Sequence, residues 1–457
     1  MITEKPFIDR EEELEILGSR YESDRAEFLV LYGRRRVGKT ELVKHFVKGK
    51  GSVYHLVSRE TEKDQIREFK ESLSRTYPEF SDLVEDWETL LTKLGEKEKP
   101  VLVIDEFQYL IETNGEILRR FQKVWDEVLK NSDIKLILTG SSVGMMETEV
   151  LGYRSPLYGR RTGQLRLKPF TLKDIKELFP SKTFTELIEI YSILGGIPYY
   201  LEQFDTDSSL EDNISNHILR KDSVLREEAV NLLREELRES KNYFSVLKAV
   251  SSGKTTFNRI SNETGIKKSS LSKYLIRLQE LHLIEKRDPV TASKGSKSGR
   301  YYLSDNYLDF WFRYIFPNQS FLEQKPELFY KDVIEPDLDI YISKKFEDIC
   351  IEFIVQTTEI YPKVGRWWYG EDEIDIVALN ENDGRILLAE CKWSKKPVDM
   401  SLLKSLKEKA SQVRWKDDHR EEEYMLFSRS GFTADLKELD DEVTLYSLDR
   451  MESEFYG

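Results

Sequence analysis

Short apolar runs alternate with helix-like stretches through the first 170 residues of the chain. Three of them, FLVLY at 28–32, VLVIDE at 101–106 and IKLILTGSS at 134–142, have the length of a buried strand. Helical patterns such as ELVKHFVK lie between them. Strands that alternate with helices predict an α/β fold with a parallel sheet, in which ligands bind at the carboxyl ends of the strands.

The middle of the chain changes to a helical pattern followed by a turn-rich segment. Residues 242–285 predict three helices, and the third carries one apolar stripe of Leu271, Leu275, Leu278 and Leu281. The segment KRDPVTASKGSKSGRYYL, rich in Gly, Ser and Lys, then predicts a hairpin between two strands. This order of elements resembles a winged helix-turn-helix, with the third helix in a major groove and the wing at 286–300 along the phosphates.

The last third predicts a helix followed by a strand pair. Residues 343–355 have an apolar helical stripe, and EIDIVAL at 373–379 and RILLAECKW at 385–393 read as strands. A two-residue loop at 382–383 would set Asp375 opposite Glu390, whereas a loop at 383–384 would set it opposite Lys392. Either register puts Asp375, Glu390 and Lys392 on one side of the sheet. A three-residue loop would break this arrangement.

Composition narrows the class of protein. A chain of 457 residues predicts two to four domains. Cys350 and Cys391 are its two cysteines, and their spacing argues against a disulfide framework or a cysteine zinc site. No apolar run approaches the roughly 20 residues that span a bilayer. The polar, acidic start MITEKPFIDREEEL is unlike a signal peptide, so we expect a cytoplasmic protein without a membrane partner.

Charge is distributed unevenly. The net charge of −14 taken alone argues against a nucleic acid partner. From Lys241 to Leu303, however, thirteen Lys and Arg residues stand against four Asp and Glu. A basic module in an acidic chain favours DNA binding by the predicted winged helix, with Lys267, Lys268, Lys273 and Arg277 off the apolar stripe. The alternative is a packing module with solvated basic faces.

The strand at 28–32 runs into GRRRVGKT, which matches the phosphate-binding P-loop in its required strand–loop–helix context. The pattern assigns ATP binding to Gly33, Arg34, Arg35, Arg36, Val37, Gly38, Lys39 and Thr40. Backbone N–H groups and the helix N-terminus would face the phosphates. Lys39 would reach the β- and γ-phosphates, and the Thr40 hydroxyl would bind Mg²⁺.

The next strand ends in two carboxylates. Asp105 would hold Mg²⁺, directly or through water, and Glu106 would act as the catalytic base that polarises the attacking water. The third strand ends in hydroxyl residues that could sense the γ-phosphate, and Thr139, Ser141 and Ser142 stay equal candidates.

These motifs together resemble the archaeal-type ATPase family of AAA+/STAND-like P-loop ATPases. The resemblance rests on FIDREEELEIL, GRRRVGKT, VLVIDEFQYL, LTGSSVGMM, SPLYGRRTGQLRLKPF and GGIPYYL, and it covers roughly residues 5–240. It implies that Phe7 to Glu11 lie near the adenine and that Gly195 to Pro198 belong to a helical lid touching the nucleotide. Arg160 and Arg161 could supply a guanidinium in cis or in trans, and a solvated basic turn is the alternative.

The pattern of one Asp, fourteen residues and then ExK, after a helix bearing Glu347, is that of the PD-(D/E)xK nuclease fold. Glu347, Asp375 and Glu390 are the predicted metal ligands, and Lys392 would orient or help to deprotonate the attacking water. The sequences FEDICIEF, GRWWYGEDEIDIVAL, LLAECKW and FSRSGF also look like the C-terminal domain, of unsettled function, that often follows this ATPase. That domain is similar to restriction-endonuclease-like folds, although fold and activity are separate claims.

The prediction is therefore an α/β multidomain protein with four parts. A P-loop parallel sheet of the AAA+-like kind is followed by a helical lid, a winged helix and a restriction-endonuclease-like domain, at 1–170, 171–240, 241–315 and 316–457. The expected task is ATP-dependent action on DNA, with Mg²⁺ and possible cleavage. The alternative is a nucleotide switch whose C-terminal domain binds DNA or a partner without cleavage. A homo-oligomer or a protein partner is compatible with either.

Overall fold

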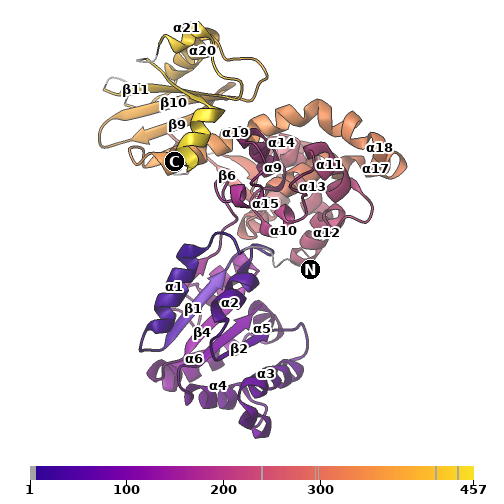
Figure 1. Cartoon of the computed structure of the whole chain (residues 1–457), viewed down its shortest axis with the longest axis vertical. Helices are drawn as coiled ribbons and strands as arrows, with labels where there is room; N and C mark the ends of the chain where they lie inside the picture. Colours follow the sequence, from indigo (N-terminus) through magenta and orange to yellow (C-terminus); the bar gives the residue numbers. More distant parts are fainter. Residues whose placement is uncertain are drawn as a thin grey trace. The chain divides into compact units, whose positions relative to one another are not determined.

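The computed structural model describes residues 7–237, 240–293, 295–296, 298–416, 419–439 and 442–456, with only the backbone of Ser240. The chain divides into two compact units (Figure 1). The first comprises the chain up to Pro169 together with Ile197–Tyr199 and Glu280–His282, and the second comprises the remainder. In the described part of the chain, no helix is both long and apolar enough to cross a bilayer.

The first unit is built on a five-stranded parallel sheet in the order β2-β3-β4-β1-β5. Its strands are β1 (Glu27–Tyr32), β2 (Ser52–Leu56), β3 (Val101–Asp105), β4 (Lys135–Gly140) and β5 (Gly163–Arg166). Its helices are α1 (Glu11–Glu22), α2 (Lys39–Val47), α3 (Glu62–Thr76), α4 (Trp87–Gly95), α5 (Gln108–Thr113), α6 (Ile117–Glu127) and α7 (Val143–Met145). The three apolar runs of the sequence are thus β1, β3 and β4, as predicted.

The order of the strands determines which loops lie close together at the edge of the sheet. Strands β1 and β3 pair with either side of β4, so the loops after these three strands meet at one edge of the sheet. Strands β1, β3 and β4 are completely buried, which explains their continuous apolar runs. Large core side chains beneath them include Trp87, Phe69 and Phe121.

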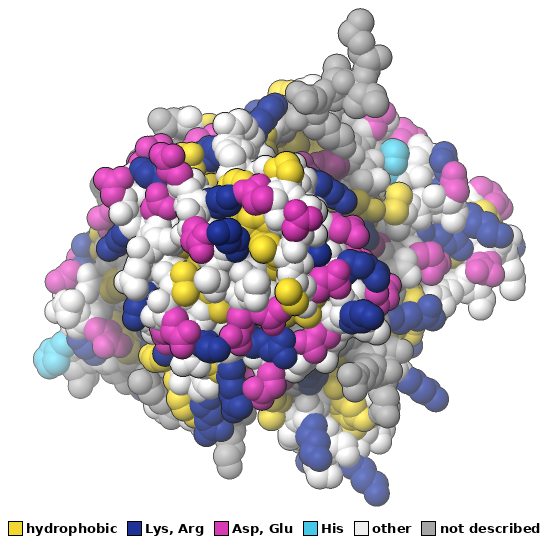
Figure 2. All heavy atoms as spheres, turned by 90° about the horizontal axis from the view of Figure 1, so that it is seen from below, with side chains coloured by type: hydrophobic (Ala, Val, Ile, Leu, Met, Phe, Trp, Pro, Cys, Tyr) yellow, Lys and Arg dark blue, Asp and Glu magenta, His cyan; other side chains and the backbone are white. Residues whose placement is uncertain are grey.

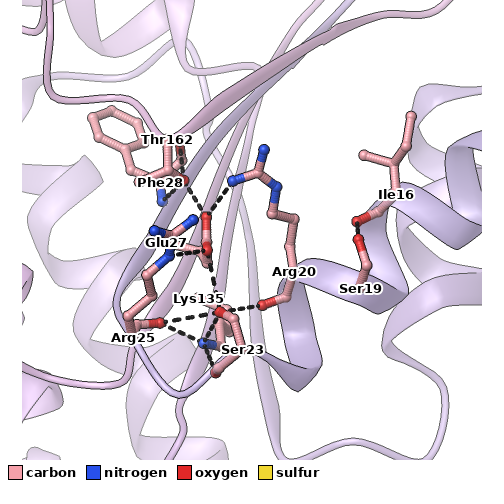
Figure 3. Close-up of polar contacts among 9 residues, drawn as sticks. All are labelled: Ile16, Ser19, Arg20, Ser23, Arg25, Glu27, Phe28, Lys135 and Thr162. Atoms are coloured by element: carbon pink, nitrogen blue, oxygen red, sulfur yellow. Dashed lines mark hydrogen bonds and ion pairs between the residues drawn. The ribbon is translucent and has the colours of Figure 1, made fainter.

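A buried ion network holds the opposite end of β1 and β4 (Figure 3). The Glu27 carboxylate accepts hydrogen bonds from Arg20 and Arg25, each at 3.0 Å, and from Thr162. The neighbouring Lys135 ammonium donates to the Ser23 and Arg25 carbonyls at 2.7 and 2.6 Å. Burial raises the pKa of Glu27, but its hydrogen bonds outweigh burial and hold that pKa below its usual value.

The second unit begins with helices and one small antiparallel strand pair. The helices are α8 (Ile175–Leu178), α9 (Phe184–Leu194), α10 (Pro198–Leu201), α11 (Leu210–Ile214), α12 (Val224–Glu236), α13 (Ser240–Ser251), α14 (Phe257–Thr264), α15 (Lys268–Glu280), α16 (Asn306–Phe310), α17 (Gln319–Gln324) and α18 (Pro326–Phe329). Strands β6 (Ile284–Arg287) and β7 (Arg300–Leu303) follow α15. The three predicted helices are α13, α14 and α15, and the leucine stripe of α15 is buried as expected.

A second five-stranded sheet, in the order β12-β11-β10-β9-β8, ends the chain. Its elements are α19 (Glu335–Thr357), β8 (Lys363–Tyr369), β9 (Asp372–Asn380), β10 (Arg385–Lys392), α20 (Met400–Ala410), β11 (Glu421–Ser428), α21 (Ala434–Lys437), β12 (Thr444–Ser447) and α22 (Leu448–Tyr456). The sheet is mixed: β8, β9 and β10 are antiparallel, and β10, β11 and β12 are parallel.

Alternate residues of β10 point to the two faces of this sheet. Trp393 and Phe427 contact Phe346 and Phe353 of α19 on one face. On the other face, Ile386 and Leu388 share a core with Leu403 and Leu406 of α20. Figure 2 shows a face of the molecule on which basic and acidic side chains are interspersed.

Candidate active sites

The P-loop joins β1 to α2 with the geometry that its glycines require. A Cβ on Gly33 would lie 2.5 Å from the Leu167 carbonyl oxygen, and Gly38 has a φ of +96°. Both positions therefore need glycine. The buried Lys39 ammonium donates to the Gly33 and Arg34 carbonyls at 2.9 and 3.0 Å. The lysine is thus folded back into the loop that would surround the phosphates.

The Asp105 carboxylate is the centre of the next group. It accepts a hydrogen bond from the Thr40 hydroxyl at 2.9 Å, and also from Tyr54 and Thr139. A hydroxyl and a carboxylate that touch at the start of α2 are the hard oxygen ligands that Mg²⁺ prefers. Thr40 and Asp105 therefore fit the predicted ion. Burial, followed by the Asp105 charge, raises the pKa of Tyr54, so the Tyr54 hydroxyl keeps its proton.

Glu106 stands beside this group with an unusual backbone, at a φ of +58°. Its Oε2 accepts from the Ser141 hydroxyl at 2.6 Å and from the Gln108 amide. The Gln108 amide also donates to the Ser141 hydroxyl at 3.0 Å. One carboxylate oxygen of the predicted base is therefore engaged by the chain. Of the three hydroxyl candidates, Thr139 faces Asp105 and Ser141 faces Glu106.

Segments distant in sequence surround the P-loop. Phe7 stacks on His45 of α2 with ring centroids 4.3 Å apart, and the Arg10 guanidinium donates to the Lys168 carbonyl at 2.8 Å. The Arg36 guanidinium lies 3.8 Å from the ring centroid of Tyr199. Phe7 and Arg10, from the segment expected near the adenine, and Tyr199, which follows the predicted lid residues Gly195 to Pro198, thus lie beside α2 and the loop. Their contact with adenine stays a prediction.

The C-terminal sheet places three of its four predicted side chains together. Asn380 pairs with Arg385 and Ile376 with Ala389, and this pairing ends one residue before Asp375. This is the first of the two predicted registers. The Lys392 ammonium lies 3.3 Å from Glu390 Oε2, and the Asp375 carboxylate accepts from the Cys391 backbone N–H at 2.9 Å.

Asp375 lies in an irregularity of β9. The pairing moves from Gly365↔Val377 to Trp367↔Ile374, so two steps along β8 match three along β9. An extra residue of this kind is a β-bulge, which redirects a side chain and is common beside active sites. Burial, then the charges of Glu347 and Glu390, raises the pKa of Asp375 well above its usual value.

Cations already balance the other carboxylates. Glu390 is almost completely buried, and Lys409 of α20 approaches its Oε1 to 2.7 Å. Glu347 forms an ion pair with Arg366, although burial still raises its pKa. Within the described ranges, no group of three or more His, Cys, Asp or Glu side chains is arranged to hold a metal ion. Asp375 and Glu390 fit a cation in their chemistry, whereas Glu347 is turned to Arg366.

The hairpin formed by β6 and β7 corrects one prediction. The Val290 N–H donates to the Arg366 carbonyl at 2.8 Å, and the Trp368 indole donates to the Ser298 carbonyl at 2.9 Å. Arg300 pairs with Glu373 at 2.7 Å, and Arg287 pairs with Asp348 at 2.5 Å. The described residues of the segment 286–300 therefore pack on β8, β9 and α19 instead of lying free to follow phosphates, because Val290 is apolar and Arg287 and Arg300 are paired with carboxylates. Lys294 and Lys297 lie outside the described residues.

Comparison with known proteins decides the family. Residues 7–204 match a family model described as an ATPase domain predominantly from Archaea. The uncharacterized protein MJECL04 of Methanocaldococcus jannaschii is 42% identical over 393 residues, which cover 85% of this chain and 87% of that protein. The chain belongs to the archaeal-type ATPase family.

Two further findings describe this archaeal-type ATPase. Residues 311–411 match a second family model, described as archaeal and bacterial proteins of unknown function. The Walker-type ATPase PABY2304 of Pyrococcus abyssi has a similar fold, with a TM-score of 0.54 at 24% identity. That similarity covers 67% of this chain and 96% of the Pyrococcus chain. The protein is accordingly a nucleotide-binding P-loop ATPase with a separate C-terminal domain of mixed sheet.

Two arginines of the ATPase unit have partners that the sequence did not suggest. The Arg160 guanidinium binds Asp126 of α6, with its Nη2 at 2.8 Å, and also the Pro156 carbonyl at 2.9 Å. Arg161 donates to the Leu151 carbonyl at 3.2 Å. Both guanidinium groups are thus bound to the protein and are not simply solvated. Before either arginine could contact a nucleotide in cis or in trans, it would have to break these hydrogen bonds.

Sequence reasoning missed three other side chains: Gln108, Tyr199 and Lys409. Gln108 lies two residues after Glu106, within the DEFQ sequence, so its position offered a signal. Lys409 offered none, because a lysine near the end of an amphipathic helix usually faces solvent.

Proposed function

We propose that this ATPase hydrolyses ATP, binds DNA, and cleaves the phosphodiester backbone in its C-terminal domain. The observation that carries the proposal is the position of the Lys392 ammonium, 3.3 Å from the buried Glu390 carboxylate, with the Asp375 carboxylate bound to the backbone N–H of the intervening Cys391. A lysine paired with a buried carboxylate at a strand end is costly without a task. The same chain carries a complete P-loop, which supports coupling of the two reactions.

In the first unit, Lys39 would leave the loop carbonyls and bind the β- and γ-phosphates. Thr40 and Asp105 would hold Mg²⁺, which supplies charge stabilisation on the phosphates when bound. Glu106 would orient the attacking water and accept its proton. For this, the Glu106 carboxylate has to exchange at least one of its contacts with Ser141 and Gln108.

DNA binding is assigned to α13–α15, which we interpret as a winged helix. The leucine stripe of α15 is buried, while Lys267, Lys268 and Lys273 are exposed. Exposed lysines on a third helix can contact phosphates and place that helix in a groove. The hairpin would then fix this module to the C-terminal sheet, so that DNA held by α15 is presented to the same unit. The proposal also includes a helical lid at 171–240, a winged helix that begins at residue 241 and a C-terminal domain that begins at residue 316.

In the C-terminal domain, Asp375 and Glu390 would hold Mg²⁺, an ion that activates water and stabilises charge on a phosphodiester. Lys392, whose side chain is 43% exposed, would orient the water at the mouth of the site. The Lys409 ammonium occupies Glu390 Oε1 in the present structure, so it would have to move away before that oxygen could bind a metal ion.

A nucleotide switch is the second candidate function. The engagement of Glu106 by Ser141 and Gln108 favours it, because a base held in this way predicts slow turnover. In that case ATP binding changes domain packing and the C-terminal domain binds without cutting.

One experiment separates the two candidates. Purified full-length protein is incubated with plasmid, linear, branched and single-stranded DNA, with Mg²⁺ or Mn²⁺, and with or without ATP, while phosphate release is followed. The nuclease proposal expects metal-dependent cutting that Asp375→Ala and Lys392→Ala abolish. No cutting of any substrate, combined with slow phosphate release, supports the switch.

A further inference from the structure

A cavity of about 660 Å³ opens at the carboxyl ends of β11 and β12. Arg429 and Lys437 bring two cations to its lining, and Ser430 and Ser447 bring hydroxyls. Phe432, Leu445 and Leu448 form an apolar wall, and Asp449 is its acidic residue. No residue of this cavity belongs to the site formed by Asp375, Glu390 and Lys392, so it requires a separate explanation.

The lining matches the two halves of a nucleotide. A phosphate needs cations and hydroxyl donors, which Arg429, Lys437 and Ser447 offer. A base needs a flat apolar surface, and stacking or apolar contact with a base is tolerant of sequence. Arg429 is held in place by other side chains, because its guanidinium lies 4.6 Å from the Trp393 ring centroid and pairs with Asp339 at 3.3 Å and Glu189 at 3.4 Å. A cation positioned in this way loses little freedom when an anion binds.

The register of the sheet connects this cavity to Lys392. Lys392 of β10 pairs with Ser428 of β11, and Ser428 pairs with Ser447 of β12. Neighbouring strands are about 4.8 Å apart, so Ser447 lies roughly 10 Å from Lys392 across the sheet. This separation is on the order of one or two nucleotide units.

The apolar part of the cavity lies on the same face of the sheet as the carboxylate site. Phe432 and Leu445 pack with the core that contains Leu403 and Leu406 of α20. Lys409 of the same helix contacts Glu390. A strand of nucleic acid crossing the ends of β10, β11 and β12 on this face would therefore meet both sites.

We propose that this cavity is a nucleotide subsite that holds the residue flanking the phosphodiester bound at Lys392. Its ligand is one nucleotide of a single-stranded segment, with the phosphate on Arg429 and Lys437 and the base against Phe432 and Leu445. The proposal rests on the nucleic acid substrate of the proposed function and adds to it a single-stranded path. Duplex DNA would have to open at this point.

The test compares charge reversal at the cavity with charge reversal elsewhere on the same sheet. Lys437→Glu is the test variant, and Lys363→Glu, an exposed residue of the far edge strand β8, is the matched control. Lys437→Arg keeps the charge. Fluorescence anisotropy with a short labelled single-stranded DNA is measured on the full chain in EDTA, over a range of salt concentrations. Thermal unfolding followed by circular dichroism and tryptophan fluorescence confirms that the C-terminal sheet of each variant is folded.

We expect Lys437→Glu to weaken binding about tenfold relative to Lys363→Glu, and to lower the salt slope by about one, as the loss of one phosphate contact requires. Lys437→Arg should bind like the parent. Equal binding by the two glutamate variants overturns the subsite. If the parent never cuts DNA while the binding difference stands, the nuclease falls and the subsite remains. If the parent cuts DNA and the glutamate variants match in binding and cutting, the subsite falls and the nuclease remains.

Discussion

At the scale of single residues, the Glu106 carboxylate of the predicted nucleotide site is held by other side chains. Glu106 has a left-handed backbone and two side-chain donors on one oxygen. Positions of this kind are strained and persist where surrounding contacts determine them. If Glu106 is the base, as we propose, hydrolysis requires both its carboxylate and the release of that carboxylate from Ser141 and Gln108.

Replacing Glu106 by Gln should keep ATP binding and slow phosphate release by about 10² to 10⁴-fold, the range typical of a lost general base. The amide keeps the size of the side chain and leaves Thr40 and Asp105 in place. Nucleotide titration and phosphate release measure the two effects. Unchanged turnover would show that Glu106 is not the base.

Lys39→Ala is the complementary change, because it removes the cation from the loop while leaving the backbone cradle. We expect ATP affinity to fall at least about tenfold, since a charge-assisted contact to phosphate contributes about 1.5 kcal/mol or more. Isothermal titration checks the loss. Lys44→Ala, an exposed lysine of the same helix, serves as the control and should bind ATP like the parent.

At this scale, a sequence can place candidate residues together where a local pattern carries them. Gly33, Gly38, Lys39 and Thr40 lie within one loop, whose spacing predicts their roles toward ATP. The structure adds Tyr199 on Arg36 and Lys409 on Glu390, contacts between residues distant in sequence. Such partners depend on how elements pack, and a single sequence does not record that packing.

At the scale of elements, the hairpin of β6 and β7 is a packing device. The Gly, Ser and Lys content of this segment predicted a hairpin. It did not predict which face of the hairpin packs on the C-terminal sheet, because Val290 is a lone apolar residue in a polar segment. The sequence narrowed the register of β9 and β10 to two choices, because the Asp383–Gly384 pair favours a tight turn and a two-residue loop can be placed there in two ways. The bulge at Asp375 left no signal in the sequence pattern.

Val290→Ala should lower the free energy of unfolding of the second unit by about 2 kcal/mol, because the valine side chain is buried against Gly365 and the core around Trp367. Val224→Ala, at a half-exposed position of α12, should change it little. Chemical denaturation followed by tryptophan fluorescence makes the comparison. Equal stability of the two variants would contradict the docking of the hairpin.

The ion network at Glu27 predicts a pH dependence in the first unit. The pKa of Glu27 is lowered in the folded state, so its stabilising effect is complete above its unfolded pKa and is lost as pH falls through the folded pKa. Glu27→Gln should cost about 1–3 kcal/mol at pH 7, because Arg20 and Arg25 lose a buried charged partner. Denaturation from pH 7 to about pH 4 should show the gap between parent and variant narrowing as pH falls. A constant gap would contradict this assignment.

At the scale of the whole molecule, the P-loop and the proposed nuclease site lie in separate units. Asp375→Ala should abolish any metal-dependent DNA cutting while ATP turnover stays within about twofold of the parent, because the carboxylate is not part of the P-loop unit. Paired assays on one preparation measure both activities. Loss of ATP turnover in Asp375→Ala would instead point to an obligatory coupling between the units.

DNA binding should depend on the lysines of α15. Reversing Lys268 and Lys273 to Glu should weaken duplex binding strongly at low salt and reduce the salt slope by about two, since two phosphate contacts are lost. Both residues are exposed, so the fold should persist. The control variant reverses Lys325 and Lys331, two exposed lysines elsewhere in the same unit, to Glu. Equal binding by both double variants would leave α13–α15 as a packing module.

The docked hairpin also determines how the gene can be divided for expression. A truncated C-terminal product that starts at residue 316, the boundary suggested by the sequence, would lack Val290, Ser298 and Arg300. Trp367 and Trp368 would then lose their cover and present aromatic surface to water, which favours aggregation. A product that starts ahead of α13, near residue 240, would bring its own cover with it. Recombinant work on the C-terminal domain should therefore begin from the longer coding segment.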